Sequence, residues 1–152
     1  MNSYYPNINT QLDEGAFMPD RAHSTDAGAD LFSTEDFILH PMSSHFVETG
    51  VHIELPENTK AEIVPKSGLN RDHNILAFGL IDQGYSGSIG VTLYNFGTEP
   101  YHFRVGDKIT QVVVSPVCYP TYTQVDEIKA GPRGSNGFGS TDRNGITGGP
   151  RP

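Results

Sequence analysis

The chain of 152 residues is long enough for one domain with a buried core. Its 18 acidic and 10 basic side chains give a formal net charge of −8, which argues against binding to a nucleic-acid polymer because that affinity comes from cations that face phosphates. A single cysteine, Cys118, cannot form an intramolecular disulfide, and no apolar run approaches about eighteen residues, so we predict a soluble, cytoplasmic protein outside the membrane.

The first part of the chain is polar and acidic. Residues 1–20 contain two prolines and one short apolar patch, and we expect an early edge strand or a loose lead-in there. In the segment 23–32, Gly28 and Ala29 allow close backbone approach beside Asp30. Two interpretations of Asp30 stay open: a solvated turn residue, or a carboxylate that faces the water shell of a metal ion.

Period-two alternation of apolar side chains dominates the middle of the chain. The runs 36–39, 46–55 and 61–64 are separated by turn signals that contain proline, and this pattern predicts strands with one buried face. Residues 67–73 are the one stretch that suits a short helix. Further strands are expected at 75–81, 102–105, 109–114 and 122–125.

The segment 79–95 places one carboxylate, Asp82, and one aromatic ring, Tyr85, between two apolar runs. Its glycines tolerate positive φ and let a backbone approach a ligand closely, and they stand at Gly79, Gly84, Gly87 and Gly90. We predict a hairpin that lines a slot. The plain alternative is a hairpin without a ligand, in which Asp82 is a turn residue and Tyr85 packs across the strands.

No segment of ten or more residues keeps a helical period, and turn signals recur every eight to twelve residues. This pattern predicts an all-β fold, a jelly roll or distorted β-barrel. After Ile128 the sequence is rich in glycine and poor in apolar side chains, so we divide the chain into a β domain, 1–128, and a flexible C-terminal arm, 129–152. The arm carries four basic residues and one acidic residue, whereas the remainder has six basic and seventeen acidic residues, net −11.

Five short motifs in order resemble those of the trimeric dUTPase family, the deoxyuridine triphosphate nucleotidohydrolases. Each is weak evidence alone, but five in order with sensible spacing form a specific signature. They are Ala27-Gly-Ala-Asp-Leu31, Pro65-Lys-Ser-Gly68, Gly79-Leu-Ile-Asp-Gln-Gly-Tyr-Ser-Gly87, Gly106-Asp-Lys-Ile-Thr-Gln111 and Arg133-Gly-Ser-Asn-Gly-Phe-Gly-Ser-Thr141.

The resemblance implies a jelly roll that forms a homotrimer, with each active site shared between chains, and an enzyme that cleaves dUTP to dUMP and pyrophosphate with Mg²⁺. Asp82 would be the catalytic carboxylate that orients the attacking water, which suits a base fixed on a rigid turn. Tyr85 would pack beneath the deoxyribose and exclude a ribose hydroxyl. Backbone groups around Gly79 and Gly90 would pair with the uracil edge, and Asp30 would contact the magnesium ion through water.

The remaining motif residues would hold the phosphates and close the site. Ser67 and Gly68 resemble a phosphate-contacting turn, and Gln111 resembles an amide that reaches the α-phosphate, although a buried amide bonded to the main chain is the open alternative. In the arm, Phe138 would stack on uracil and Gly139 would free the backbone to curl around the phosphates. The residues that would hold the γ-phosphate are Arg133, Ser140 and Thr141. Taken alone, a glycine-rich arm is typical of plain disorder.

Two departures from the family pattern stand out. Lys66 occupies the place of the usual Arg, which keeps the charge but loses the bidentate fork, and Asp142 stands where glycine is common. Two alternatives remain beside dUTP hydrolysis. One is a relative of the dCTP deaminases, which resemble this family in fold. The other is an additional regulatory function through a protein partner, for which residues 142–152 offer a contact segment.

Overall fold

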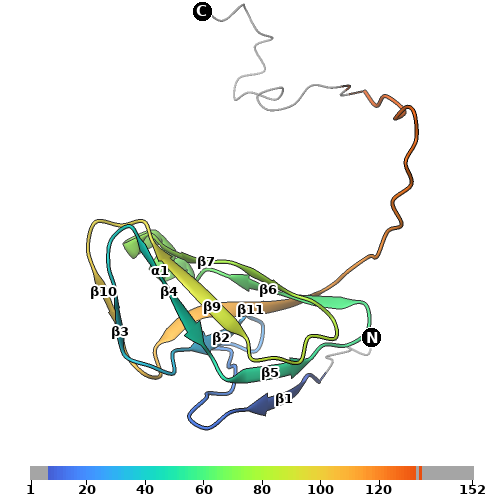
Figure 1. Cartoon of the computed structure of the whole chain (residues 1–152). Coiled ribbons are helices and arrows are strands. Elements are labelled where there is room, and N and C mark those ends of the chain that lie inside the picture. The colour runs from blue at the N-terminus through green and yellow to red at the C-terminus, as the bar shows by residue number, and fades with distance from the viewer. Residues whose placement is uncertain (1–6, 133, 135–152) are drawn as a thin grey trace, which may run out of the picture. The chain divides into compact units, whose positions relative to one another are not determined.

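The computed structural model describes residues 7–132 and 134. These residues divide into two units after Cys118, and every helix and strand named here lies in the first unit. The division that we predicted after residue 128 stays a prediction. The elements in chain order (Figure 1) are β1 Asn9–Leu12, β2 Ala29–Phe32, β3 Phe37–Leu39, β4 Ser43–Glu48, β5 Val51–Glu54, β6 Thr59–Val64, α1 Ser67–His73, β7 Ile75–Ala77, β8 Gly79–Ile81, β9 Gly90–Asn95, β10 Tyr101–Phe103 and β11 Lys108–Pro116.

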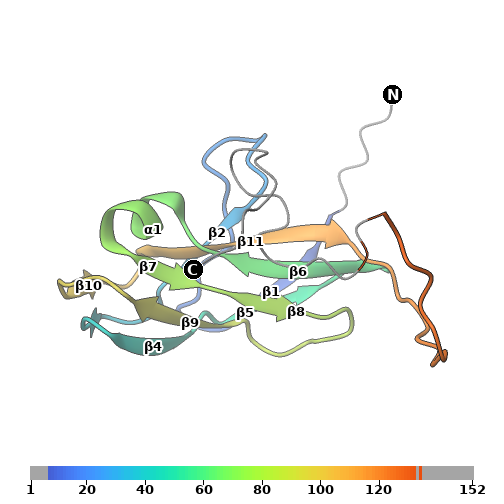
Figure 2. The same ribbon diagram turned by 90° about the horizontal axis from the view of Figure 1, so that it is seen from above.

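The strands form an antiparallel jelly roll, as predicted. One sheet has four strands in the order β2–β11–β6–β8, a second has three in the order β4–β9–β7, and two further pairs are β1–β5 and β3–β10. Every pairing is antiparallel. Figures 1 and 2 show β4 and β9 in one layer and β6 and β11 in the layer behind it. Strands that pair within a sheet are mostly far apart in the sequence, so the fold depends on long-range contacts.

The core lies between these two layers, where alternate side chains of the facing strands point inward. Leu93 on β9, Ala61 on β6 and Leu31 on β2 are completely buried. The buried amide of Asn95 is fully hydrogen-bonded, because its Nδ2 donates to two carbonyl oxygens and its Oδ1 accepts from Gly97 N at 2.8 Å. A satisfied polar group of this kind fixes the turn after β9 without a desolvation penalty.

The predicted helix at 67–73 is confirmed as α1. It follows Lys66, whose backbone is extended, and ends at Asn74 in the left-handed conformation, with φ of 54°. The Asn74 N–H donates to Asn70 O at 3.0 Å. Asparagine tolerates positive φ better than most residues, so this side chain suits the end of the helix.

Three local predictions are wrong. The single strand expected at 75–81 is two strands in different sheets, because β7 pairs with β9 and β8 pairs with β6. The segment 79–95 is not a hairpin, because β8 pairs with β6 whereas β9 pairs with β4 and β7. The chain changes sheet in the loop 82–89, where Ile89 N donates to Val51 O at 2.8 Å. Residues 122–125 form no strand, and Tyr122 is 91% exposed. Alternation alone does not make a strand, because a strand also needs a partner backbone and cross-strand side chains.

Candidate active site

The four-stranded sheet gathers most of the predicted site residues that the structure describes. Asp30 lies on β2 and Gln111 on β11, and these two residues are directly opposite each other. Lys66 follows β6, the strand on the other side of β11. Asp82 follows β8, which pairs with β6. Motifs far apart in sequence therefore occupy neighbouring strands of one sheet (Figure 2).

The strand register nevertheless separates these residues into two groups. Gln111 lies opposite Val64 near the end of β6, whereas Ile81 lies opposite Ala61. Asp82 is one residue further along, so about four residues, or roughly 13 Å along the strands, separate it from Gln111. We call the Asp82 group the nucleoside half-site and the Asp30–Gln111 group the phosphate half-site, after the roles that the motif resemblance implies. One chain holds both halves, but it does not bring them into contact distance.

The nucleoside half-site is a small cavity of about 200 Å³. It brings together three residues that the sequence predicted, Asp82, Tyr85 and Gly90, and it is completed by Leu80, Ile81 and Ile89. Asp82 is exposed, and its main-chain oxygen accepts a hydrogen bond from Tyr85 N at 3.1 Å. This turn holds the carboxylate and the aromatic ring on the same short loop.

The Tyr85 ring folds back over its own loop. Its hydroxyl donates to Ser88 O at 3.0 Å, and a Cβ on Gly87 would lie 2.4 Å from the hydroxyl oxygen. Gly87 is therefore needed for the ring to adopt this position. Tyr85 remains 49% exposed, so one face of the ring is available to a ligand.

The two glycines predicted to expose backbone to uracil also have packing reasons. A Cβ on Gly90 would lie 2.4 Å from Cζ of Phe46, and a Cβ on Gly79 would lie 3.2 Å from Cγ1 of Ile63. Both glycines are exposed in this chain. Their contacts leave the backbone approachable, and the contact with uracil stays a prediction.

The phosphate half-site is built around Asp30, which is only 6% exposed. Its Oδ1 accepts from Lys66 Nζ at 2.6 Å and its Oδ2 lies 2.7 Å from Lys108 Nζ. Burial alone would raise the pKa of Asp30, but the hydrogen bonds and charges of Lys108 and Lys66 outweigh it and hold the pKa below its ordinary value. The same pairing raises the pKa of Lys108.

Lys108 is a site residue that the sequence analysis missed. It lies inside the quoted motif 106–111, but nothing in its sequence position shows that it faces the same carboxylate as Lys66. Two ammonium groups share one buried carboxylate, and Asp20 and Asp26 also act on Lys108.

The Gln111 side chain is held by the main chain, as the structural alternative proposed. Its Nε2 donates to Pro65 O at 3.0 Å, which ties β11 to the turn before α1. A Cβ on Gly28 would lie 2.3 Å from Gln111 Oε1, so Gly28 makes room for this amide. Ser67 and Gly68, the first residues of α1, are exposed next to it.

The residues described by the structure contain no group of three or more His, Cys, Asp or Glu side chains that could hold a metal ion. A direct protein cage for magnesium is therefore not offered within this range. Asp30 fits a contact through water, because a carboxylate has about four acceptor directions and the two lysines use one on each oxygen. The phosphates of a ligand would have to supply the direct ligands of the ion.

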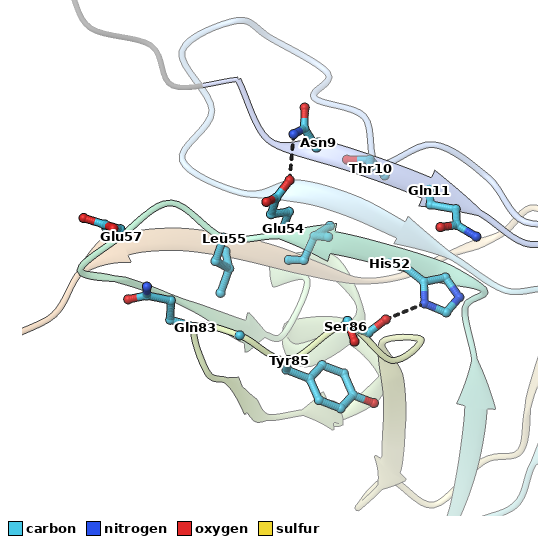
Figure 3. A pocket seen from close by; sticks show the side chains of 12 residues that line it. Asn9, Thr10, Gln11, His52, Glu54, Leu55, Glu57, Gln83, Tyr85 and Ser86 are labelled. Carbon is cyan, nitrogen blue, oxygen red and sulfur yellow. Dashed lines mark hydrogen bonds between the residues drawn. The ribbon is translucent and has the colours of Figure 1, made fainter.

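A larger cavity, about 650 Å³, also lies against the Tyr85 loop (Figure 3). It is lined by β1, β5 and residues 83–86, with the carboxylates of Glu54 and Glu57 on its wall. Of the predicted site residues that the structure describes, it contains only Tyr85. The smaller cavity holds the predicted catalytic carboxylate, and we therefore take that cavity as the reaction side of the loop.

The predicted arm residues lie outside the described residues: Arg133, Phe138, Gly139, Ser140 and Thr141. Their roles stay predictions. The described part of the chain also has no helix that is long and apolar enough to cross a membrane.

Comparison with known proteins gives the same family as the motifs. Residues 14–142 match the profile of the dUTPase family. The deoxyuridine 5'-triphosphate nucleotidohydrolase of Clostridium novyi is 44% identical over 134 residues, which cover 86% of this chain and 94% of that protein. The corresponding mouse protein is 38% identical over 135 residues, covering 88% of this chain and 83% of that protein.

Solved structures agree with the sequence comparison. The dUTPase of Staphylococcus bacteriophage 80alpha with dUPNHPP has a TM-score of 0.84 at 27% identity, covering 91% of this chain and all of that chain. A dUTPase variant from phage phi11 is described with a coordinated structural Mg(II) ion. It has a TM-score of 0.76 at 27% identity, and the match covers 82% of this chain and 100% of that chain.

The jelly-roll fold and the matched relatives thus place the chain in the class of nucleotidohydrolases. The chain belongs to the dUTPase family, and the enzyme class predicted from its motifs is confirmed.

Proposed function

We propose that this chain cleaves dUTP to dUMP and pyrophosphate. The observation that carries the proposal is the arrangement of the family motifs in one sheet, with Asp82, Tyr85 and Gly90 around one cavity and Asp30, Lys66 and Gln111 at the other half-site. The relatives that match are dUTPases, which favours phosphate cleavage over the deaminase alternative.

In the proposed reaction, a water molecule attacks the α-phosphorus in line with the bond to the β-phosphate. The water oxygen forms the new bond to phosphorus, its proton passes to the Asp82 carboxylate, and pyrophosphate leaves with the electrons of the broken bond. Tyr85 packs against the deoxyribose, and the exposed backbone at Gly79 and Gly90 reads uracil. An exposed turn carboxylate can act as this base because water and substrate can reach it.

Lys66, Ser67 and Gln111 bind the phosphates in this proposal, and Lys108 holds Asp30 between the two ammonium groups. When bound, Mg²⁺ would neutralise part of the triphosphate charge. Asp30 would reach the ion through water. Arg133, Ser140 and Thr141 of the arm hold the γ-phosphate and Phe138 covers the base, as in the family pattern. Lys66 supplies charge but no bidentate fork, so its contact with phosphate is less directional than that of arginine.

We also propose a homotrimer whose active sites are shared between chains. The separation of roughly 13 Å along the strands supports this assembly, because a phosphate bound at Gln111 and a water oriented by Asp82 must meet at one atom. A neighbouring copy that supplies the second half-site would bring the two groups to one phosphorus atom. Repeating the same contact around a threefold axis closes a ring of three chains.

The proposed binding partners of this enzyme are dUTP and further copies of the same chain. We do not expect it to bind a membrane or a nucleic-acid polymer. The phage 80alpha dUTPases are described as controlling the transfer of virulence genes by a G protein-like mechanism, which supports a regulatory protein partner as a second function. The contact segment predicted for it, 142–152, lies outside the described residues. A cytoplasmic location suits the exposed free thiol of Cys118.

Pyrophosphate release tests the activity directly, with dUTP, dCTP and UTP measured in parallel. We expect release from dUTP alone, and a pure binding protein would release none from any of them. In a Tyr85→Ala variant the ratio of kcat/KM for UTP over dUTP should rise, because space opens below the sugar. Tyr85→Phe keeps the ring and serves as the control. An unchanged ratio in Tyr85→Ala would remove Tyr85 from sugar selection.

Subunit mixing tests the shared sites. Asp82→Asn damages one half-site and Gln111→Ala the other, so each variant alone should be nearly inactive. After random exchange of chains, about one quarter of sites would combine an intact half from each variant, and a similar fraction of wild-type activity should return. Exchange is verified by copurification of two differently tagged variants. Verified exchange without recovered activity would show that each chain completes its own site.

A further inference from the structure

His52 on β5 connects the loop that carries Asp82 and Tyr85 to the turn after β1, and Figure 3 shows its contact with Ser86. Its Nδ1 lies 2.9 Å from the main-chain oxygen of Ser86, and its Nε2 lies 3.2 Å from Oδ2 of Asp13. Asp13 follows β1, and its own N–H donates to Gly50 O at 2.9 Å. The ring therefore bridges the active-site loop and the turn after β1.

The partners of His52 determine its protonation state by hydrogen-bonding chemistry. A carbonyl oxygen and an ionised carboxylate can only accept hydrogen bonds, so both ring nitrogens must donate to satisfy both contacts. Only the imidazolium has two N–H donors. Neutral His52 can keep the contact with Ser86 or the contact with Asp13, but not both.

Among the described residues, the carboxylates that act on the ring favour this cationic form. Asp13 faces it from the turn after β1, Glu48 acts on it from the end of β4, and Glu54 lies on the same strand and on the same cavity wall. The Ser86 carbonyl and then Asp13 raise the pKa of His52 above its ordinary value, although burial opposes the shift. The double contact is therefore complete below the ordinary pKa and is lost as the pH rises through the raised pKa.

The rest of the loop is tied down by groups that do not titrate. Gly50 N donates to Ser88 Oγ at 3.1 Å, Ile89 N donates to Val51 O at 2.8 Å, and Asn58 N donates to Gln83 Oε1 at 2.9 Å. These contacts fix the two ends of the segment 82–89. Ser86 lies between them, one residue after Tyr85, so the His52 contact acts on the middle of the loop.

We propose that His52 is a positioning residue for the active site: its imidazolium clamps the Ser86 carbonyl to Asp13 and so holds Asp82 and Tyr85 in their working geometry. This inference rests on the proposed function of the site. The inference adds His52, a residue outside the five motifs, to the site. It also predicts that the position of the loop 82–89 depends on pH, because loss of one ring proton releases one end of the clamp.

The test compares kcat/KM for dUTP between wild type and His52→Gln from about pH 6 to about pH 9, a range that spans the histidine titration. The glutamine amide carries its two N–H donors on one nitrogen and does not titrate, so it does not reproduce the two-ended, pH-dependent contact of the imidazolium. The ratio of wild type to variant cancels the titrations that both share. We expect a ratio of about two to five at the acidic end, the size of a partly exposed ion pair, falling toward about one at the alkaline end.

His45→Gln is the matched control. His45 also pairs with a carboxylate, at 2.9 Å from Glu35 Oε1, and its ring stacks on Phe37 with 4.0 Å between centroids, far in sequence from the loop 82–89. The ratio of kcat/KM for dUTP between wild type and His45→Gln should stay constant across the same pH range. A constant ratio for His52→Gln as well would overturn the proposal.

Hydrogen exchange of the ligand-free protein gives a readout that does not depend on catalysis. Relative to wild type, His52→Gln should exchange the amides of residues 82–89 about two to five times faster at the acidic end of the range, and His45→Gln should not. Equal exchange in all three proteins would contradict the clamp. If wild type released no pyrophosphate from dUTP, the proposed function would fail, and hydrogen exchange would still decide the role of His52.

Discussion

Asp82 and Asp30 show how two carboxylates of one protein differ through their surroundings. Asp82 is exposed on a turn between β8 and the sheet-crossing loop, where it can meet water and substrate. Asp30 is almost completely buried between two ammonium groups. The first environment suits a group that exchanges a proton, and the second suits a group that keeps its charge.

Replacing Asp82 by Asn should remove the base while leaving its shape. We expect kcat to fall by about 100-fold or more, with an unchanged melting temperature and nearly unchanged affinity for dUMP, because the amide cannot accept the proton of the attacking water. Single-turnover cleavage of dUTP and calorimetric binding of dUMP measure the two quantities. A variant that kept more than about a tenth of the wild-type kcat would not have lost its general base.

Asp30 makes a prediction about stability and pH. Its folded pKa is lowered, so its contribution to stability is present above the unfolded pKa of about 3.9 and is lost as the pH falls through the folded value. The difference in melting temperature between wild type and Asp30→Asn should be large at neutral pH and should shrink below about pH 4.

Asp72→Asn is the control for this measurement. Asp72 also pairs with a cation, since its carboxylate accepts from Arg71 at 2.6 and 2.8 Å, but that pair is exposed. Solvent screens such pairs strongly. The melting-temperature difference from wild type should therefore change little with pH for Asp72→Asn. A change as large as that for Asp30→Asn would mean that burial between the lysines does not strengthen the pH dependence of stability.

At the scale of elements, β2, β11 and the turn after β6 are joined by side chains as well as by their ladders. Gln111 on β11 reaches the Pro65 carbonyl, and Asp30 on β2 reaches Lys66. Gly28 gives Gln111 its space. The phosphate half-site is therefore one packed unit, in which a change at the start of β2 acts on the turn before α1.

Gly28→Ala tests this coupling. The new methyl group would lie 2.3 Å from Gln111 Oε1 and 3.1 Å from its Cβ, so the amide must leave Pro65. We expect a loss of about 1–3 kcal/mol of stability from overpacking, together with a higher KM for dUTP. Thermal denaturation and steady-state kinetics measure both effects. Gly68→Ala, whose methyl group has nothing within 4 Å, is the control for stability alone, and equal melting temperatures in the two variants would contradict the clash.

At the scale of the whole molecule, one chain carries two half-sites that its own register keeps apart. The arm adds a third part, for which the family pattern implies closure over the substrate. If the arm closes as the resemblance implies, fixing about ten residues costs on the order of 10 to 20 kcal/mol of backbone freedom, so we expect closure only with phosphates, metal and base together. Stacking of Phe138 on uracil, about 1–3 kcal/mol by analogy with other base stacking, is insufficient alone.

Ending the chain after Lys129 tests the arm. The shortened protein should keep its oligomeric state and melting temperature and bind dUMP nearly as before, but it should lose most dUTP cleavage because the site stays open to water. Light scattering, thermal denaturation and pyrophosphate release follow the three properties. Full activity without residues 130–152 would show that the arm is not a lid, and a dissociated oligomer would give it a structural role.

Much of this protein could be read from local sequence patterns. Alternation of apolar residues predicted the β class, the proline and glycine signals separated the strands, and α1 was placed at its observed bounds. The motif residues Asp82, Tyr85 and Gly90 were predicted together, and they line one cavity. These features are local because strand faces, turns and glycine conformations depend on neighbouring residues.

Only the tertiary structure determined the features that depend on residues far apart in the sequence. The sequence contains the residues of the crossing loop 82–89, but only the pairing of β8 with β6 and of β9 with β4 shows that the loop joins two sheets. Lys108 and His52 became site residues only when folding placed them against Asp30 and Ser86. A charge or a ring acts on groups within a few ångströms, and long-range strand register, not sequence spacing, sets those distances.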